Sequence, residues 1–387
     1  MLSPRQRSRR RGSDRATRQN SAGGLRQRVS AVPLVSVVVR STGRPQLAEA
    51  LAAIAAQTYP AIEVVLVDAS GAAHPPVGAA SGAFPLVFVA ASAPRPRPVA
   101  ANAGLTAASG RYLGFLDDDD LVEPGHVAGL VAALEANRGY ALAYAQSREI
   151  AQGRIVAVRA RPYSRLLLFQ DCYLPNNAVL FRREILARCR FDESLEVCED
   201  WDFWLQASAV SDFLAVPQET AIYRSELGTS GMGAAAGMNR DFAKYERFRA
   251  KVAVKWRAEG ERLFAELERD FERAVALYAA GDRAGSESAA AALLARYPYH
   301  VGALSLAGTL RALEGDFAGA AGQFRLAVDE SPEDPGTQFN LAQALERLGR
   351  AGEAREHYRR AIELEPAYPH ARARLAALDS LPERSNP

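Results

Sequence analysis

The chain has 387 residues, of which 48% are hydrophobic and 24% are charged, as in ordinary soluble proteins of two or more domains. Its formal charge of +2 is unevenly distributed, since residues 1–30 hold nine arginines and one aspartate and carry +8, whereas the remaining residues carry −6. The folded part therefore lacks the basic surplus of a nucleic-acid-binding protein, and no nucleic-acid partner is expected.

Residues 1–30 are rich in arginine, serine, glutamine and glycine and have no hydrophobic periodicity. This composition predicts a disordered basic tail. Such a tail is more often solvated than bound, although contact with anionic lipid or nucleic acid is an alternative for the tail itself.

The next part of the chain, predicted to form a domain over residues 31–237, alternates between strand and helix patterns. Strand patterns lie at 34–39, 62–67, 86–89 and 111–116, and helical patterns lie after the first strand and at 99–109. This alternation predicts an α/β fold with a doubly wound, mostly parallel, Rossmann-like sheet. Neither a G-x-G-x-x-G sequence nor a P-loop is present, which argues against a dinucleotide site and a Walker-type site.

Two of these strands end in carboxylates. The strand at 62–67 is followed by Asp68, and the strand at 111–116 runs directly into the four aspartates 117–120. Because parallel strands end at one edge of a sheet, these acids can converge there although they lie far apart in sequence. Adjacent carboxylates become favourable when a hard divalent cation shares their oxygens, although a solvated acidic turn is the simpler alternative.

Further strand patterns lie at 140–144, 155–158, 174–181 and 213–223, with a helical pattern at 199–205. Trp201 and Trp204 share one face of that helix, so we expect them in the core. Glu199, Asp200 and Asp202 lie at its start, where the helix dipole favours anions, and this effect alone would explain one or two of them. A mobile loop is predicted over 225–237.

From residue 238 the chain is helical and contains a repeat. Gly281, Gly315 and Gly349 recur every 34 residues, and so do three prolines, at positions 298, 332 and 366. Two independent markers with one period indicate a helix-turn-helix array. The segment resembles tetratricopeptide repeats, which predicts an all-α domain over 266–380 after a helical linker over 238–265. Such repeats either extend or dimerise an enzyme or bind a protein or acceptor.

Residues 33–230 resemble the inverting glycosyltransferases of family 2, which have the GT-A fold. The ordered matches that carry the resemblance are "PLVSVVVRSTGRP", "ALAAIAAQTYPAIEVVLVDAS", "RPVAANAGLTAASGRYLGFLDDDD" and "FDESLEVCEDWDFWL". The resemblance implies transfer of a sugar from a nucleotide-sugar donor, with a UDP-sugar expected, to a saccharide, lipid-linked or protein acceptor. Bacterial polysaccharide or glycoconjugate synthesis is the expected setting.

The resemblance also assigns roles to single residues. On the donor side, Asp68 would contact the base, and Asp117 would lie near the ribose or phosphate beside Asp118. Asp119, together with Asp117, would hold a divalent metal, Mn²⁺ or Mg²⁺. The remaining assignments are Arg97 and Asn102 in the donor pocket, Asp200 as the general base and Glu199 beside it.

These residues suffice for the chemistry. A metal on the strand-end acids would neutralise the departing diphosphate, and a carboxylate would take the proton of an acceptor hydroxyl. The alternatives are a nucleotidyl or phosphoryl transferase, a glycoside hydrolase, and a repeat-based scaffold with an inactive transferase-like domain. The scaffold is disfavoured because the acids at 68, 117, 119 and 200 are all present.

Three cysteines, Cys172, Cys189 and Cys198, have no metal-ligand spacing and are expected to be reduced. The five histidines are scattered, which argues against a zinc site. No apolar run reaches the length of a membrane span, and the N-terminus has no apolar core of signal-peptide type. We therefore expect a cytoplasmic protein, with peripheral contact to the inner face of the membrane as an option.

Overall fold

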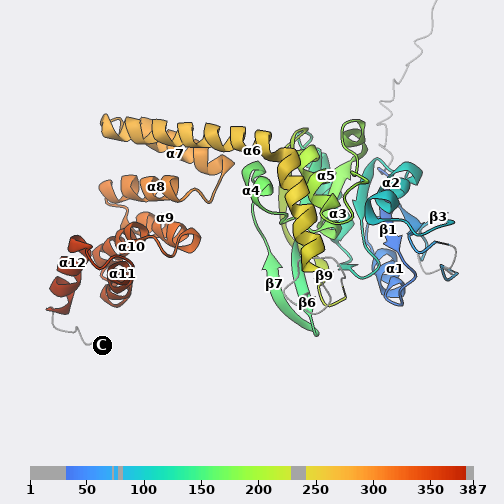
Figure 1. Cartoon of the computed structure of the whole chain (residues 1–387), viewed down its shortest axis with the longest axis horizontal. Helices are drawn as coiled ribbons and strands as arrows, with labels where there is room; N and C mark the ends of the chain where they lie inside the picture. The colour runs from blue at the N-terminus through green and yellow to red at the C-terminus, as the bar shows by residue number, and fades with distance from the viewer. Residues whose placement is uncertain (1–31, 72–73, 77–81, 228–240, 381–387) are drawn as a thin grey trace, which may run out of the picture. The chain divides into compact units, whose positions relative to one another are not determined.

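A computed structural model of the chain describes residues 32–71, 74–76, 82–227 and 241–380 (Figure 1). The predicted basic tail, residues 1–30, and most of the loop predicted over 225–237 lie outside these ranges, so neither prediction is tested.

One sheet organises the first half of the described chain. It contains β1 (Val35–Ser41), β2 (Ile62–Asp68), β3 (Leu86–Val89), β4 (Tyr112–Phe115), β5 (Leu121–Val122), β6 (Leu142–Ala151), β7 (Arg154–Arg159), β8 (Val179–Arg182) and β9 (Phe213–Arg224). The strand order is β3-β2-β1-β4-β8-β6-β9-β5, with β7 paired to β6. The strands β1 to β4 are mutually parallel, as are β6 and β9, whereas β5, β7 and β8 run against their neighbours. The expected doubly wound α/β fold is confirmed, with a mixed sheet.

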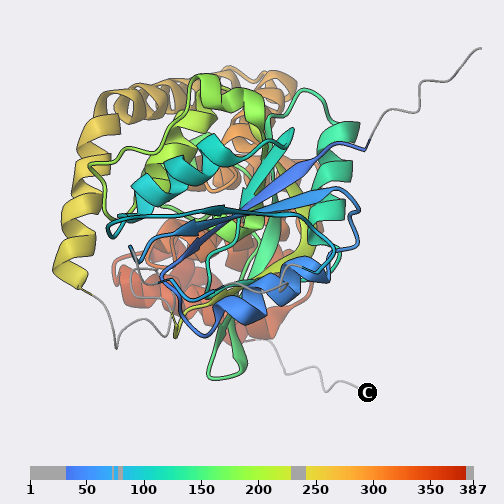
Figure 2. The same cartoon turned by 90° about the vertical axis from the view of Figure 1, so that its right-hand side faces the viewer.

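Helices cover both faces of this sheet (Figure 2). They are α1 (Leu47–Ala55), α2 (Arg97–Ala107), α3 (His126–Ala136), α4 (Arg165–Gln170) and α5 (Glu199–Ser208), with 3₁₀ turns η1 (Asn176–Ala178) and η2 (Arg183–Ala187). α1 and α3 share one apolar core with the sheet, whereas α2 and α5 share the core of the other face. The β-branched runs of β1 and β2 are therefore buried on both sides, as their composition predicts.

Two elements were not predicted, and one begins later than expected. β5 has only two residues and α4 only six, lengths too short for a periodic pattern. The strand expected over 174–181 starts at Val179, because residues 176–178 form a 3₁₀ turn after Pro175. Trp201 and Trp204 are buried in the core, as predicted.

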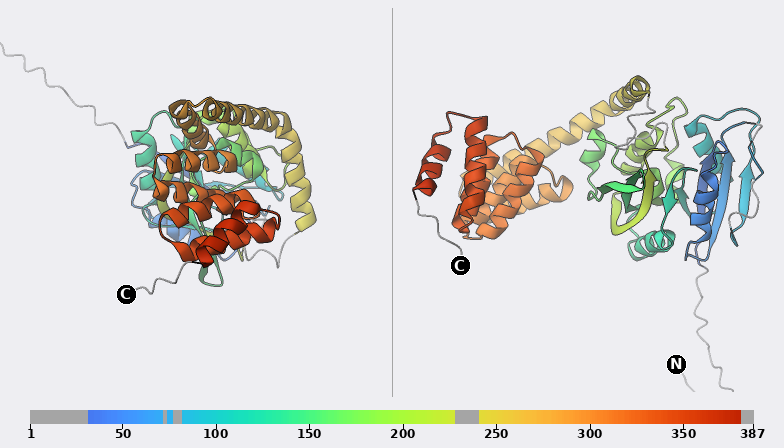
Figure 3. Two further views of the ribbon diagram at one scale, coloured as in Figure 1. Left: turned by 90° about the vertical axis from the view of Figure 1, so that its left-hand side faces the viewer. Right: turned by 90° about the horizontal axis from the view of Figure 1, so that it is seen from below.

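The second half of the described chain is helical. It contains α6 (Phe242–Ala279), α7 (Arg283–Arg296), α8 (Val301–Leu313), α9 (Phe317–Glu330), α10 (Pro335–Arg347), α11 (Ala351–Leu364) and α12 (Pro369–Asp379). Figure 3 shows consecutive helices from α8 onward lying side by side. Gly281, Gly315 and Gly349 each have φ between 75° and 85° and end the first helix of a pair. Only glycine adopts this left-handed backbone cheaply, which explains the period of 34 residues.

The first half of α6 packs on the α/β domain. Phe248 and Val252 belong to the same buried core as Trp204. Asp202 of α5 is fully buried, accepts a 2.8 Å hydrogen bond from Trp256 Nε1 and pairs with Lys255 at 2.9 Å. Asp202 is therefore one electrostatic anchor of α6, and its carboxylate is the only fully buried one among the ion pairs that join α6 to the α/β domain within the described ranges.

In the described part of the chain, no helix is both long enough and apolar enough to cross a membrane. α6 has 38 residues, but charged side chains recur along it.

The anchor can be tested by equilibrium unfolding in urea. Asp202→Ala removes the acceptor of Trp256 and one of the two carboxylates that pair with Lys255, so we expect the free energy of unfolding to fall by about 2 kcal/mol. Glu246→Ala is the control, because its pair with Arg249 spans 3.7 Å on an exposed face of α6. That change should alter stability by less than about 0.5 kcal/mol. Equal effects of the two substitutions would contradict the assignment.

Candidate active site

The site forms where the parallel strands end. β1 pairs with β2 so that Ser41 lies beside Asp68, and β1 also pairs with β4, which leads into Asp117. The strand-end residues therefore meet at one edge of the sheet, as the parallel arrangement predicts.

Arg40, near the end of β1, joins this edge to helix α5. Its guanidinium donates two hydrogen bonds to the Asp117 carboxylate, Nε to Oδ1 at 2.7 Å and Nη2 to Oδ2 at 2.6 Å. Its third nitrogen, Nη1, donates to Glu199 Oε1 at 2.9 Å. The side chains of Arg40 and Glu199 are 5% and 1% exposed, so these charges are compensated inside the protein and not by water.

Arg97, at the start of α2, completes the cluster. Its Nε donates to Glu199 Oε1 at 2.8 Å, and its Nη2 lies 3.4 Å from Asp117 Oδ2. Burial alone would raise the pKa of Asp117, but Arg40 and Arg97 lower it to about 2. The same two arginines lower the pKa of Glu199 against its burial. We call these four residues, Arg40, Arg97, Asp117 and Glu199, the ion cluster.

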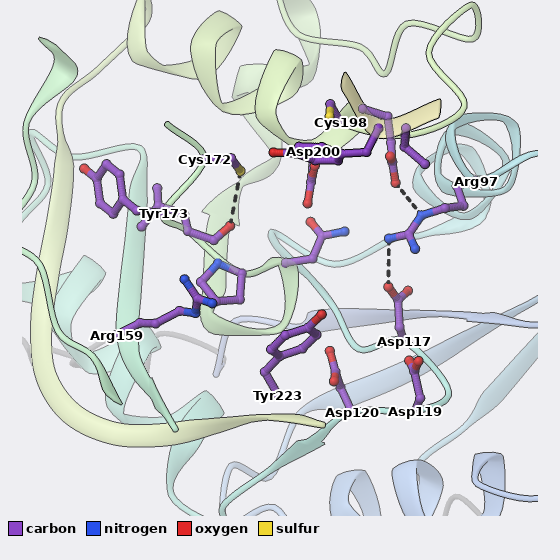
Figure 4. Close-up of a pocket in the computed structure, with 16 residues that line it drawn as sticks. Arg97, Asp117, Asp119, Asp120, Arg159, Cys172, Tyr173, Cys198, Asp200 and Tyr223 are labelled. Atoms are coloured by element: carbon purple, nitrogen blue, oxygen red, sulfur yellow. Dashed lines mark hydrogen bonds and ion pairs between the residues drawn. The ribbon is translucent and has the colours of Figure 1, made fainter. Parts of the chain in front are cut away.

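A cavity lies against the ion cluster (Figure 4). Its lining residues are Arg97, Asp117, Asp119, Asp120, Arg159, Cys172, Tyr173, Leu174, Pro175, Asn176, Val197, Cys198, Glu199, Asp200, Tyr223 and Tyr245. Figure 4 shows Asp200 on one side of this cavity and Asp119 and Asp120 on the opposite side.

Asp117, Asp119 and Asp120 bring three carboxylates to one wall. Asp119 pairs with Arg44 at 3.1 Å, and Asp120 accepts a hydrogen bond from Arg224 N at 3.2 Å. Burial, followed by repulsion from neighbouring aspartates, raises the pKa values of both Asp119 and Asp120. A divalent cation would relieve this repulsion.

Oxygen donors of this kind fit Mg²⁺ or Mn²⁺ and not a soft metal. Within the described ranges, no three or more histidine, cysteine or acidic side chains are already grouped as a metal site. The fit of this wall to Mg²⁺ or Mn²⁺ therefore rests on the oxygen donors that its aspartates offer and not on a preformed arrangement of ligands.

Asp200 lies at the start of α5 and is half-buried. Burial, followed by repulsion from Glu199, raises its pKa to about 6 although Arg97 acts in the opposite direction. Its Oδ1 accepts a 2.8 Å hydrogen bond from Trp201 N, which fixes the carboxylate. A carboxylate with this pKa is ionised at neutral pH and still basic enough to take a proton.

Three of the residues predicted for donor binding do not line the cavity. Asp68 accepts hydrogen bonds from Ser70 N and Gly71 N and thereby shapes the turn after β2. Asp118 accepts from Thr42 N at 3.1 Å and from the Arg44 guanidinium.

Asn102, the third, bonds to the loop before α5. Its Nδ2 donates to Phe191 O at 3.0 Å and to Glu193 Oε1 at 2.9 Å, and its Oδ1 accepts from Phe191 N.

Sequence reasoning missed Arg40, Arg44 and Asn176, and it gave Asp120 no role of its own. The available signal for Arg40 was a charged residue inside an otherwise buried strand, since charges are rarely buried without a partner. Asn176 had no comparable signal, because asparagine after proline is ordinary in a turn.

Comparisons with known proteins find a transferase family and a repeat family in this chain. Residues 36–187 match the model of the glycosyl transferase family 2, and residues 335–368 match a tetratricopeptide repeat. An uncharacterized glycosyltransferase of Bacillus subtilis, YwdF, is 28% identical over 197 residues, which cover 49% of this chain and 73% of that protein. The uncharacterized protein y4gI of Sinorhizobium fredii is 27% identical over 243 residues, or 58% of this chain and 26% of that protein.

Among solved structures, S. aureus TarS 1–349 superposes with a TM-score of 0.46 at 15% identity, covering 87% of this chain and 91% of that one. These matches identify residues 36–187 as a family 2 glycosyltransferase domain and residues 335–368 as a tetratricopeptide repeat. The family 2 match ends at residue 187, before α5, and does not include Glu199 and Asp200. Only the structure places these two residues beside the strand-end acids.

The ion cluster predicts a pH-dependent contribution to stability. Arg40→Lys keeps one positive charge but loses the two-pronged bond to Asp117, so we expect the free energy of unfolding at pH 7 to fall by about 2 kcal/mol. The folded-state pKa of Asp117, about 2, lies below its ordinary value of 3.8, so the stabilisation is present above pH 4 and is lost as the pH falls from 4 towards 2.

The difference between wild type and Arg40→Lys should therefore shrink over that pH range in urea titrations. Arg190→Lys, at an exposed i,i+3 pair, is the matched control and should have almost no effect. A difference that stays constant down to pH 2 would contradict the role given to Asp117.

Proposed function

We propose that this chain, with its family 2 glycosyltransferase domain, is an inverting, metal-dependent glycosyltransferase that moves a sugar from a nucleotide-sugar to a hydroxyl acceptor. The ion cluster is the observation that supports this best. It holds the strand-end acid Asp117 and the start of α5 together, so that Asp119 and Asp200 line opposite sides of one cavity.

The donor would bind on the side of the strand-end acids. Asp117 and Asp119 would hold Mn²⁺ or Mg²⁺, and a cation bound there neutralises charge on a departing diphosphate. Arg97 would face the donor phosphates from the adjacent wall. Asp68, at the end of β2, is the proposed contact of the base, with a UDP-sugar as the proposed donor.

Asp200 would act as the general base. It takes the proton of the acceptor hydroxyl while the hydroxyl oxygen forms a bond to the anomeric carbon and the bond from that carbon to the diphosphate breaks. A single displacement of this kind inverts the anomeric centre. Glu199 is then a positioning residue, because its carboxylate is already shared by Arg40 and Arg97.

The acceptor is a saccharide, a lipid-linked molecule or a protein, and the setting is bacterial polysaccharide or glycoconjugate synthesis. The repeats would bind a protein partner or a second copy of the chain. We propose a cytoplasmic protein that reaches the inner face of the membrane.

Donor binding is the first test, by calorimetry with a panel of nucleoside diphosphates and nucleotide-sugars, with and without Mn²⁺. We expect one diphosphate to bind only with the metal, and Asp119→Asn to weaken that binding by at least about tenfold. A chelator should abolish it in the wild type.

Asp316→Asn is the control, since Asp316 caps α9 far along the chain and asparagine caps equally well. It should bind the diphosphate like the wild type. Failure of every diphosphate and nucleotide-sugar to bind the wild type would refute the transferase and favour the inactive scaffold.

The pH dependence of kcat/KM tests the base. Asp200 must be ionised to accept a proton, so activity should fall tenfold per pH unit below a pKa of about 6. Glu199→Gln removes the neighbouring negative charge and should move this acid limb to lower pH. Asp200→Asn should reduce kcat/KM by at least about a hundredfold. If the acid limb stays at the same pH in Glu199→Gln, the group whose ionisation causes it is not Asp200.

A further inference from the structure

Asn176 has a side-chain amide without a partner. Its side chain lines the cavity and the residue is 7% exposed, yet neither Oδ1 nor Nδ2 has a hydrogen-bond partner within the described part of the chain. Buried polar groups in native proteins are nearly always paired, so an unpaired amide in a cavity wall indicates a ligand that is absent here.

The neighbouring Asn177 gives a partial contrast, because its Nδ2 is bonded although its Oδ1, too, has no partner among the described residues. Its Nδ2 donates to Ile222 O at 3.0 Å and to Leu121 O at 3.5 Å, and so ties η1 to β9 and β5. Ala178, the last residue of the turn, is fully buried. The turn that carries Asn176 is therefore fixed, and only rotation about its side-chain bonds is needed to aim the amide.

The residues around Asn176 indicate which ligand its amide would bind. Asn176 continues the wall formed by Cys172 to Pro175, and Figure 4 places Cys172 and Tyr173 across the cavity from Arg97 and Asp117. This wall carries no carboxylate of the metal type. Cys172, at its start, lies next to Asp200 in Figure 4. The wall therefore faces the molecule whose hydroxyl loses a proton and not the diphosphate.

We propose that Asn176 selects the acceptor by binding two neighbouring hydroxyl groups of a saccharide. Its Oδ1 would accept from one hydroxyl and its Nδ2 would donate to the next, which is the two-pronged pattern that a primary amide offers. The inference rests on the proposed function and deepens it, since it specifies an acceptor with adjacent hydroxyls and excludes an isolated one.

Ligand-observed NMR titrations can test this, with saturating UDP and Mn²⁺ present. The probes are the methyl pyranosides of glucose, galactose and mannose, together with their monodeoxy analogues. We expect at least one glycoside to bind the wild type, and Asn176→Ala to weaken it about tenfold, the loss of one or two hydrogen bonds. The analogue that lacks one of the two contacted hydroxyls should lose less affinity on Asn176→Ala than the parent glycoside does, because only one hydrogen bond to the amide remains to be lost.

Two controls separate recognition from structure. Asn137→Ala, at the exposed end of α3, should leave glycoside binding unchanged. Asn176→Ala should keep the melting temperature of the wild type, because no hydrogen bond of the described residues is lost, whereas Asn177→Ala should lower it.

Several outcomes would overturn the proposal. Equal glycoside binding by wild type and Asn176→Ala would mean that the amide of Asn176 bonds to water and not to the acceptor. Weaker UDP binding by Asn176→Ala would mean that the amide contacts the donor. Absence of glycoside binding to the wild type would exclude a free saccharide acceptor at Asn176. Each of these leaves UDP binding by the wild type intact, whereas the transferase itself would be refuted only if no diphosphate or nucleotide-sugar bound the wild type.

Discussion

One guanidinium group, that of Arg40, carries the constraint on which the site depends. A buried positive charge needs partners within the protein, and its three nitrogens take them from Asp117 and Glu199, which are 77 and 159 positions away. The ends of β1 and β4 and the start of α5 must therefore meet. The arginines of the ion cluster lie close to Asp200 but are paired with Asp117 and Glu199. The pKa of Asp200 therefore remains raised, at about 6, by burial and by the charge of Glu199.

Much of this arrangement can be read from the sequence, because local patterns encode it. The buried strands, the acids at their ends and the 34-residue repeat all follow from short-range periodicity. What the sequence hides is the identity of partners. Asn102 looks like a pocket residue, but its amide is used by Phe191 and Glu193. Asp202 looks like part of an acidic site, but it anchors α6 through Trp256. Such assignments depend on contacts between distant residues, which no window of sequence contains.

Asn176 and Asn177 also show that the sequence does not reveal which partner a side chain has. Two adjacent asparagines have identical chemistry and identical propensity, yet one bonds to backbone carbonyls of two strands and the other has no partner among the described residues. The difference follows from the geometry of η1, which directs successive side chains in different directions. A rigid turn thus places a structural residue and a recognition residue next to each other.

The run of four aspartates at 117–120 has a consequence for comparing this chain with its relatives. In the structure the four residues are not equivalent: Asp117 bonds to Arg40, Asp118 bonds to Thr42 N and Arg44, Asp119 pairs with Arg44 alone among the described residues, and Asp120 bonds to Arg224 N. Three of them, Asp117, Asp119 and Asp120, line the cavity, whereas Asp118 does not. An alignment, however, can slide a gap through four identical letters at no cost in score. Equivalent positions in relatives with fewer aspartates should therefore be assigned by the contacts that each carboxylate makes and not by the order of letters.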